Sequence, residues 1–139
     1  METAKLKAFN TEALAYMGDA VYEQAVRQRL IEQGHSRVDL LHKTAVHYVR
    51  AEAQADIIKS IFDELDEEEQ ALVKRARNHR FHSKAKHADP ITYKWATAFE
   101  ALLGLLDLTG SKERLQETAA RAFEMIEQHS LEDTEKQNA

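Results

Sequence analysis

Two short motifs constrain the fold most, because each places a glycine inside a run of residues that is otherwise typical of a helix. In the first, Gly18 is followed by Asp19; in the second, Glu100 is followed four residues later by Gly104. A glycine in a helix interior costs roughly 1 kcal/mol against alanine, so it usually has a packing or functional reason. One such reason is a close helix crossing. If the two helices cross where their side chains are smallest, the two acids come within reach of one divalent cation.

The rest of the chain also predicts helices. Capping residues mark their starts and glycines mark two of their ends, whereas no strand alternation of useful length and no internal repeat is present. We therefore expect an all-α fold. The first expected helical region begins at Asn10 and ends before Gly34. The second runs from Ser36, with Asp39 as a capping-box variant, to Phe62, with a break near residues 46–48. Three further helices should cover residues 66–78, 89–109 and 111–128.

Length and composition indicate one globular domain. With 139 residues and 43% apolar residues, the chain can form a core of its own, which we place at about residues 10–128. The tails 1–9 and 131–139 should be weakly ordered, because they offer little to bury. No apolar run approaches the roughly 18 residues of a membrane span. The absence of cysteine and of an apolar signal core favours a cytoplasmic protein without disulfides.

The acids beside the glycines are candidates for a metal site. Asp19 falls at the margin of the core face of its helix, and Glu12 and Glu23 lie within about 40° of it on the helical wheel, which makes a ridge of acids. In the later helix, Glu100 falls opposite an apolar face, in a strip with small residues such as Ala96. Mg²⁺ prefers oxygen ligands and often binds only one or two carboxylates. The alternative is that these acids are solvated or form ion pairs.

The two motifs resemble those of the ribonuclease III family. The segment Leu14 to Val21 matches the family signature Leu-Glu-Phe-Leu-Gly-Asp-Ala/Ser-Val/Leu, and the segment Glu100 to Gly104 matches a second motif, Glu-Ala-Leu/Ile-Ile/Leu-Gly. Order and phase agree, and the resemblance covers roughly residues 10–127. The chain is similar in particular to the short bacterial branch called Mini-ribonuclease III, which consists of the catalytic domain alone.

The resemblance implies a fold and an activity. The fold would be the helical bundle of the ribonuclease III endonuclease domain, without a separate double-stranded-RNA-binding domain. Asp19 and Glu100 would be the catalytic, metal-binding residues of an endoribonuclease that uses Mg²⁺, with Mn²⁺ as a substitute, and leaves a 5′ phosphate and a 3′ hydroxyl. Glu12 and Glu23 would be auxiliary acids. The implied partners are a second copy of the chain, double-stranded RNA in the form of the 23S ribosomal RNA precursor, and, as a candidate helper, a ribosomal protein.

The charge distribution agrees with an RNA partner, although the net charge is −5. Between Lys74 and Lys94 the chain has seven Lys or Arg residues against one acid, with histidines interleaved. Such a block is typical of a phosphate-backbone contact. A solvated face that balances the acidic run Asp63 to Glu69 is the alternative.

The candidate RNA contacts follow from this block and from a second basic stripe. In the block, which includes a predicted loop at 78–88, they are Lys74, Arg75, Arg77, Asn78, His79, Arg80, Lys84 and Lys86. The second stripe comprises Lys43, His47 and Arg50, which share a helical face; a solvated face is again the alternative. A zinc site at His79, His82 and His87 is disfavoured, because the segment has no firm ligand geometry and no cysteine.

The chain lacks half of the family's usual acidic quartet. Larger relatives have a glutamate where this chain has Ala15, and an aspartate where it has Thr97. These gaps leave two alternatives to an enzyme. One is a catalytically inactive double-stranded-RNA or ribosome-binding module with the same fold, and the other is a helical protein-interaction domain with no RNA role.

Overall fold

The computed structural model describes residues 1–6, 9–79 and 89–138, and within these ranges it contains helices and no strand. The all-α prediction is therefore confirmed. The helices are α1 (Thr3–Leu6), α2 (Thr11–Glu32), α3 (Val38–Val49), α4 (Ala51–Ile61), the 3-10 turn η1 (Phe62–Glu64), α5 (Glu67–Asn78), α6 (Pro90–Leu108) and α7 (Lys112–Asn138). None of them is long and apolar enough to cross a membrane, as far as the described residues go.

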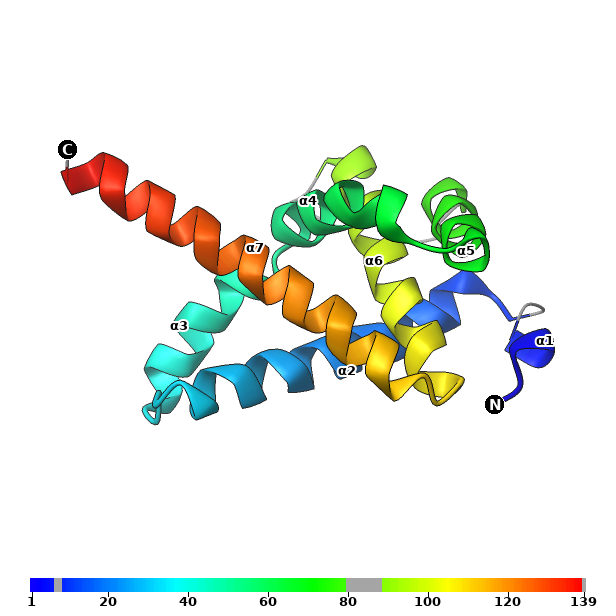
Figure 1. The fold of residues 1–139 in the computed structure, drawn as a ribbon, viewed down its shortest axis with the longest axis horizontal. Helices are drawn as coiled ribbons and strands as arrows, with labels where there is room; N and C mark the ends of the chain where they lie inside the picture. The colour runs from blue at the N-terminus through cyan, green and yellow to red at the C-terminus, as the bar shows by residue number, and fades with distance from the viewer. Residues whose placement is uncertain (7–8, 80–88, 139) are drawn as a thin grey trace.

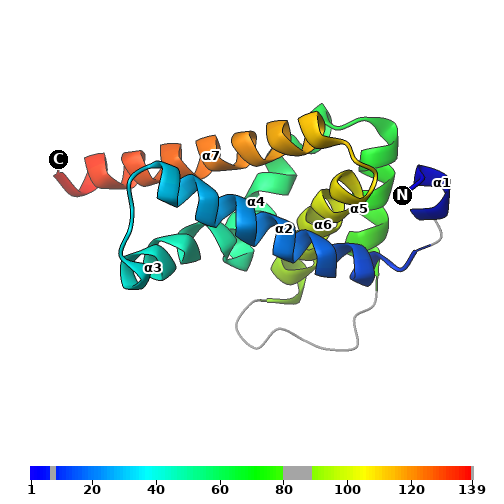
Figure 2. The ribbon, with the colours of Figure 1, turned by 90° about the horizontal axis from the view of Figure 1, so that it is seen from below.

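Helix α6 lies at the centre of the bundle. It packs against α2 on one side and against α4 and α5 on the other, while α7 runs across the bundle and extends beyond it at the carboxyl terminus (Figures 1 and 2). Nearly every residue of α6 from Ala96 to Leu106 is buried, including Thr97 and Gly104. The strip of small residues predicted around Glu100 is therefore not an exposed face, because neighbouring helices cover both sides of α6.

The capping residues set most helix ends as predicted. The Asn10 side chain accepts a hydrogen bond from the backbone N–H of Glu12, and Asp89 accepts from the N–H groups of Ile91 and Thr92. Two glycines with positive φ, 99° at Gly34 and 74° at Gly110, follow the ends of α2 and α6. Glycine suits these positions because it adopts positive φ without a steric cost.

Some boundaries differ from the prediction. Ser36 does not cap α3; Arg37 occupies the N-cap position without a side-chain cap, and it pairs with Asp39 instead. The break between α3 and α4 falls at Arg50, after the predicted range, where the backbone is extended at φ −62° and ψ 150°. At the ends of the chain, α7 continues past Gln128 to Asn138.

The amino-terminal segment is better anchored than expected. Its short helix α1 was not predicted, and Leu6 at the end of this helix is completely buried in the hydrophobic core. Burial of a leucine side chain contributes about 1.5–3 kcal/mol, which offsets part of the entropy lost when the segment is ordered. The weak order predicted for the other tail, residues 131–139, stays a prediction.

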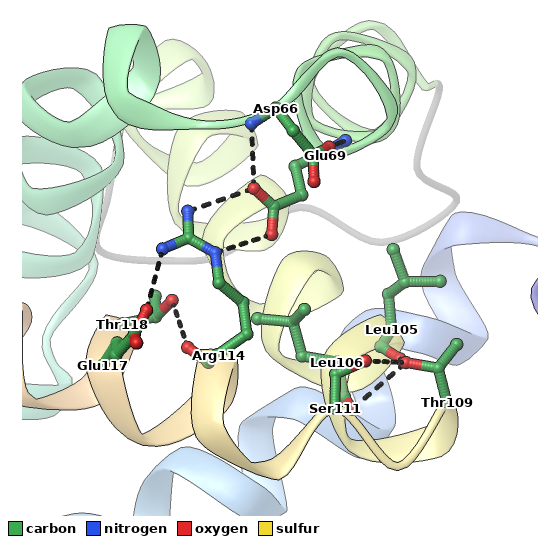
Figure 3. Close-up of polar contacts among 9 residues, drawn as sticks. All are labelled: Asp66, Glu69, Leu105, Leu106, Thr109, Ser111, Arg114, Glu117 and Thr118. Carbon is green, nitrogen blue, oxygen red and sulfur yellow. Dashed lines mark hydrogen bonds and ion pairs between the residues drawn. The ribbon is translucent and has the colours of Figure 1, made fainter.

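A buried carboxylate joins α5 to α7 (Figure 3). Glu69, only 4% exposed, closes a capping box with Asp66 at the start of α5. Its two oxygens also accept hydrogen bonds from the guanidinium group of Arg114 in α7. Nε donates to Oε2 at 3.0 Å, and Nη2 donates to Oε1 at 3.1 Å. A bidentate pair of this kind fixes orientation as well as distance. The start of α7 is thereby held against α5, on the side of the bundle that supports α6.

We predict that Arg114→Ala lowers the free energy of unfolding by about 3 kcal/mol, because it leaves the Glu69 carboxylate buried and unpaired. Urea unfolding followed by circular dichroism measures the change. The matched control is Arg121→Ala, which breaks the exposed pair between Arg121 and Glu64 at 3.7 Å. It should cost less than about 1 kcal/mol. Equal losses for the two variants would contradict the structural role assigned to Glu69.

Candidate active site

Helices α2 and α6 cross with their backbones in contact at two glycines. A Cβ atom on Gly18 would overlap the carbonyl oxygen of Glu100, and one on Gly104 would overlap the carbonyl oxygen of Leu14. No side chain separates the helices at this point, because even a methyl group lacks room there. The close helix crossing predicted from the two glycines is confirmed.

The crossing brings the two motif acids together. Asp19 follows Gly18 and is exposed, whereas Glu100 lies beneath Gly18 and is largely buried. Their carboxyl groups lie close enough to interact, and at neutral pH Glu100 keeps its proton. Burial, followed by the hydrogen bond and the negative charge of Asp19, raises the pKa of Glu100 to about 9.

Such a pair fits a divalent cation. Two adjacent carboxyl groups favour a positive charge between them. Their oxygens are also the type of ligand that Mg²⁺ and Mn²⁺ prefer. Within the described ranges, no group of three or more His, Asp or Glu side chains is arranged to hold a metal. A cation at this place would therefore have two protein carboxylates, and its other ligands would be water or substrate oxygens.

The two auxiliary acids are directed to other partners. Glu12 pairs with His79, which follows the end of α5, with 3.3 Å between Oε1 and Nε2. Glu23 pairs with Arg27 one turn further along α2, at 3.2 Å. Glu12 and Glu23, at the two ends of the predicted ridge of acids, therefore each pair with a different basic residue. An auxiliary role for Glu12 and Glu23 stays a prediction.

The two positions where larger relatives have acids are buried. Ala15 is 7% exposed and Thr97 is 5% exposed. The Thr97 hydroxyl donates a hydrogen bond to the carbonyl oxygen of Tyr93, 2.9 Å away in its own helix. Neither side chain therefore supplies a carboxylate, and Thr97 uses its hydroxyl within α6.

The predicted basic residues lie on two surfaces. On α5, Lys74, Arg75 and Asn78 are exposed and Arg77 is half-buried, as is His79 directly after the helix. Around the second half and the end of α3, the exposed residues are Lys43, His47 and Arg50. The remaining candidates fall outside the described residues: Arg80, Lys84 and Lys86, together with His82 and His87 of the disfavoured zinc site.

Two residues beside the α5 surface, Lys59 and Trp95, are not among the predicted contacts. Lys59 of α4 and Arg77 both lie over the ring of Trp95, at 5.7 Å and 4.9 Å from its centroid. Lys59 lies outside the basic block in the sequence, and Trp95 is uncharged, so the charge distribution indicates neither residue. A local pattern could not have joined them, because they come from different helices.

Comparison with known proteins places this geometry in context. A family model described as the Ribonuclease III domain matches residues 12–111. The chain is 49% identical to the Mini-ribonuclease 3 of Symbiobacterium thermophilum over 82% of its own length and 88% of the relative's, and 47% identical to that of Enterococcus faecalis over 80% and 86%. It also resembles the X-ray crystal structure of protein FN1578 from Fusobacterium nucleatum, with a TM-score of 0.76 and 28% identity over 86% of this chain and 95% of that one.

We predict that Gly18→Ala or Gly104→Ala forces α2 and α6 apart, because the added methyl group overlaps a backbone carbonyl oxygen. Each variant should lose several kcal/mol of stability, as overpacked core sites do, and both should lose the contact between Asp19 and Glu100. The control is Gly34→Ala, which adds no close contact but places alanine at φ 99°. It should cost about 1 kcal/mol. Thermal unfolding ranks the variants, and an unaffected Gly18→Ala protein would refute the crossing.

We also predict a pH-dependent stability that originates at Glu100. Its pKa rises from 4.5 to about 9 on folding, so between these values the folded protein binds a proton that the unfolded chain does not. Stability from this group is complete below pH 4.5 and is lost as the pH rises towards 9. In EDTA, Glu100→Gln should therefore exceed the parent in melting temperature by a margin that grows from pH 5 to pH 9. A margin that does not change with pH would count against the carboxyl pair.

Proposed function

Because this chain belongs to the ribonuclease III family and is an endoribonuclease, we propose that it cleaves double-stranded RNA at a divalent-cation site formed by Asp19 and Glu100. The observation that carries the proposal is the carboxyl pair at the glycine crossing. The two side chains are brought together at a half-buried position from separate helices. Two carboxylates in this arrangement repel each other unless a proton or a cation lies between them.

Mg²⁺ is the cation we propose, with Mn²⁺ as a substitute. When bound, such an ion polarises the scissile phosphate, lowers the pKa of a water molecule and stabilises the leaving 3′ oxygen. The protein contributes to this chemistry by holding both carboxylates in place against their mutual repulsion. The products would be a 5′ phosphate and a 3′ hydroxyl.

The site would depend on substrate for its completion. Ala15 and Thr97 supply no carboxylate, so a cation at this site would be bound by two acids and would keep several waters. An RNA phosphate would supply further oxygen ligands. We therefore expect weak cation binding in the absence of RNA. The rate of cleavage would then depend on how tightly the basic surfaces bind the RNA duplex.

The basic residues of α5 are the proposed RNA contacts, together with the α3 stripe. A-form RNA is recognised mainly through its phosphates, its 2′ hydroxyls and its shape, and exposed cations such as Lys74 and Arg75 suit phosphate contacts. His79 links this surface to the acid site, because it pairs with Glu12 on the helix that carries Asp19. Arg80, Lys84 and Lys86 follow directly in the sequence and extend the same proposal.

A homodimer is part of the proposal, because two centres related by a two-fold axis can cut both strands of a duplex. The surface of α2 beside the acid site supports it. Tyr16, three residues before Asp19, is 85% exposed, and Ala13 and Ala20 are exposed one turn to either side of it. An apolar strip of this kind suits contact with a second copy of α2.

The substrate we propose is the precursor of 23S ribosomal RNA, cut near its paired ends, with a ribosomal protein as a candidate helper. The likeness of the two motifs to the Mini-ribonuclease III branch supports this assignment. The specific observation that favours a second function, an inactive RNA-binding module, is the absence of acids at Ala15 and Thr97. We favour the enzyme because the remaining two acids lie in contact.

Cleavage of a long RNA duplex in Mg²⁺ tests the proposal. The parent should cut the duplex, whereas Asp19→Asn and Glu100→Gln should each lower the rate at least 100-fold, because either change removes one of two cation ligands. Glu12→Gln and Glu23→Gln should change it less than tenfold, since their carboxylates pair with His79 and Arg27.

Glu124→Gln, on the exposed side of α7, is the matched control and should match the parent. Tight duplex binding by the parent without strand cuts at any Mg²⁺ or Mn²⁺ concentration would favour the binding module. Full activity of both Asp19→Asn and Glu100→Gln would exclude the proposed site.

A further inference from the structure

Besides Arg29, which lies over Phe123, three cations of the described residues lie over aromatic rings around α4, α5 and α6. Lys59 and Arg77 lie over Trp95, and Lys74 lies over Phe62 at 5.7 Å from the ring centroid. The five residues come from α4, η1, α5 and α6, and they form one patch that we call the cation–aromatic strip. Lys59 and Lys74 are exposed, whereas Arg77 and the two rings are half-buried.

The cations of the strip form no close ion pair within the described ranges. The charge of Lys59 nevertheless acts on the nearby carboxylate of Asp89. Other cations of the structure do form ion pairs: Arg27, Arg29, Arg37, Arg114 and Arg121. An acid near the strip, Asp89, caps α6 through hydrogen bonds to Ile91 and Thr92. The strip therefore keeps charge available for a ligand.

The rings hold these cations in place without neutralising them. A cation over an aromatic face is attracted by the negative potential of the ring, and its remaining donors stay open to solvent. Holding a long side chain in advance also reduces the entropy lost when a ligand binds. Lysine and arginine fixed in this way suit an anion with several oxygens, and Arg77 presents a fork that matches phosphate.

The strip and the acid pair share one helix, α6. Trp95 precedes Glu100 by five residues of α6, which is about 7.5 Å along the helix axis. The residue two after Arg77 is His79, which pairs with Glu12 on α2. We expect a duplex with one phosphate at the acid pair to extend further phosphates around the amino-terminal part of α6, where Trp95 lies.

We propose that the cation–aromatic strip binds the phosphate backbone of the RNA duplex, with Lys59 and Arg77 as phosphate contacts and Trp95 as the residue that positions both. The proposal rests on the proposed function and deepens it, because it adds a contact from α4 and an aromatic support to the basic surface of α5. It also makes three helices, α4, α5 and α6, contribute to one RNA site.

Trp95 is the single tryptophan of the chain, so its fluorescence reports on the strip directly. With EDTA present to keep the RNA intact, addition of a duplex should change the emission of Trp95 saturably, and added salt should reverse the change. The anisotropy of the same duplex, labelled, gives the binding curve in parallel. Binding seen by anisotropy with no change in Trp95 emission would overturn the proposal.

Substitutions distinguish the residues that contact phosphate from the residue that positions them. Lys59→Gln should weaken duplex binding several-fold in low salt, reduce the slope of log affinity against log salt by about 0.9, as for one phosphate contact on DNA, and raise KM with little change in kcat. The matched control is Lys112→Gln, at the first residue of α7 and beyond the carboxyl-terminal end of α6, which should match the parent. Equal affinities for Lys59→Gln and Lys112→Gln would refute the phosphate contact.

Trp95→Leu should weaken binding in the same way, because it removes the ring beneath both cations, and Trp95→Phe should restore most of the affinity. Melting temperatures show whether each variant is folded. If Trp95→Leu is folded and binds like the parent, Trp95 does not position the cations. These outcomes differ from a failure of the proposed function, in which the parent itself would leave duplex RNA uncut.

Discussion

The backbone contact between α2 and α6 is the constraint on which the rest of the structure depends. Gly18 and Gly104 allow two buried helices to approach until a carbonyl oxygen of each occupies the space of a missing Cβ on the other. This approach sets the position of α6 at the centre of the bundle, and it also sets the contact between Asp19 and Glu100. Fold and site are therefore specified by the same two residues. A glycine costs stability in each helix, and the close packing that it permits offsets that cost.

The acid pair is held at an energetic cost, which the surrounding structure offsets. A carboxyl group that is buried beside another carboxyl resists ionisation, as the raised pKa of Glu100 indicates. The helices cannot relax apart, since α4 and α5 pack on the opposite side of α6 and the buried pair of Glu69 with Arg114 fixes α7 to α5. In the function we propose, a divalent cation removes the repulsion and RNA phosphates supply the ligands that Ala15 and Thr97 do not. Strain of this kind is expected at functional sites.

Local signals predicted what depends on local chemistry. Asn10, Asp66 and Asp89 cap their helices, and Gly34 and Gly110 follow helix ends, because each of these effects acts within a few residues. The contact of Asp19 with Glu100 was also predictable, since the glycines imply a crossing. Burial of α6 on both sides was not, because the helical wheel of one helix contains no information on how many neighbours surround it. The same reason explains why Lys59 was missed: its partner ring comes from another helix. The ridge of Glu12, Asp19 and Glu23 was correct in its geometry on the wheel, but His79 and Arg27 pair with its two ends.

The central claim is that the glycine crossing makes a divalent-cation site of Asp19 and Glu100. Crystals grown with Mn²⁺ and a short RNA duplex, measured at the manganese absorption edge, test it most directly, because anomalous scattering locates the ion without assumptions about activity. The account predicts a peak within about 2.0–2.3 Å of carboxylate oxygens of both residues, with an RNA phosphate oxygen among the other ligands. A peak held by other side chains, or RNA bound in the crystal with no ion between Asp19 and Glu100, would contradict it.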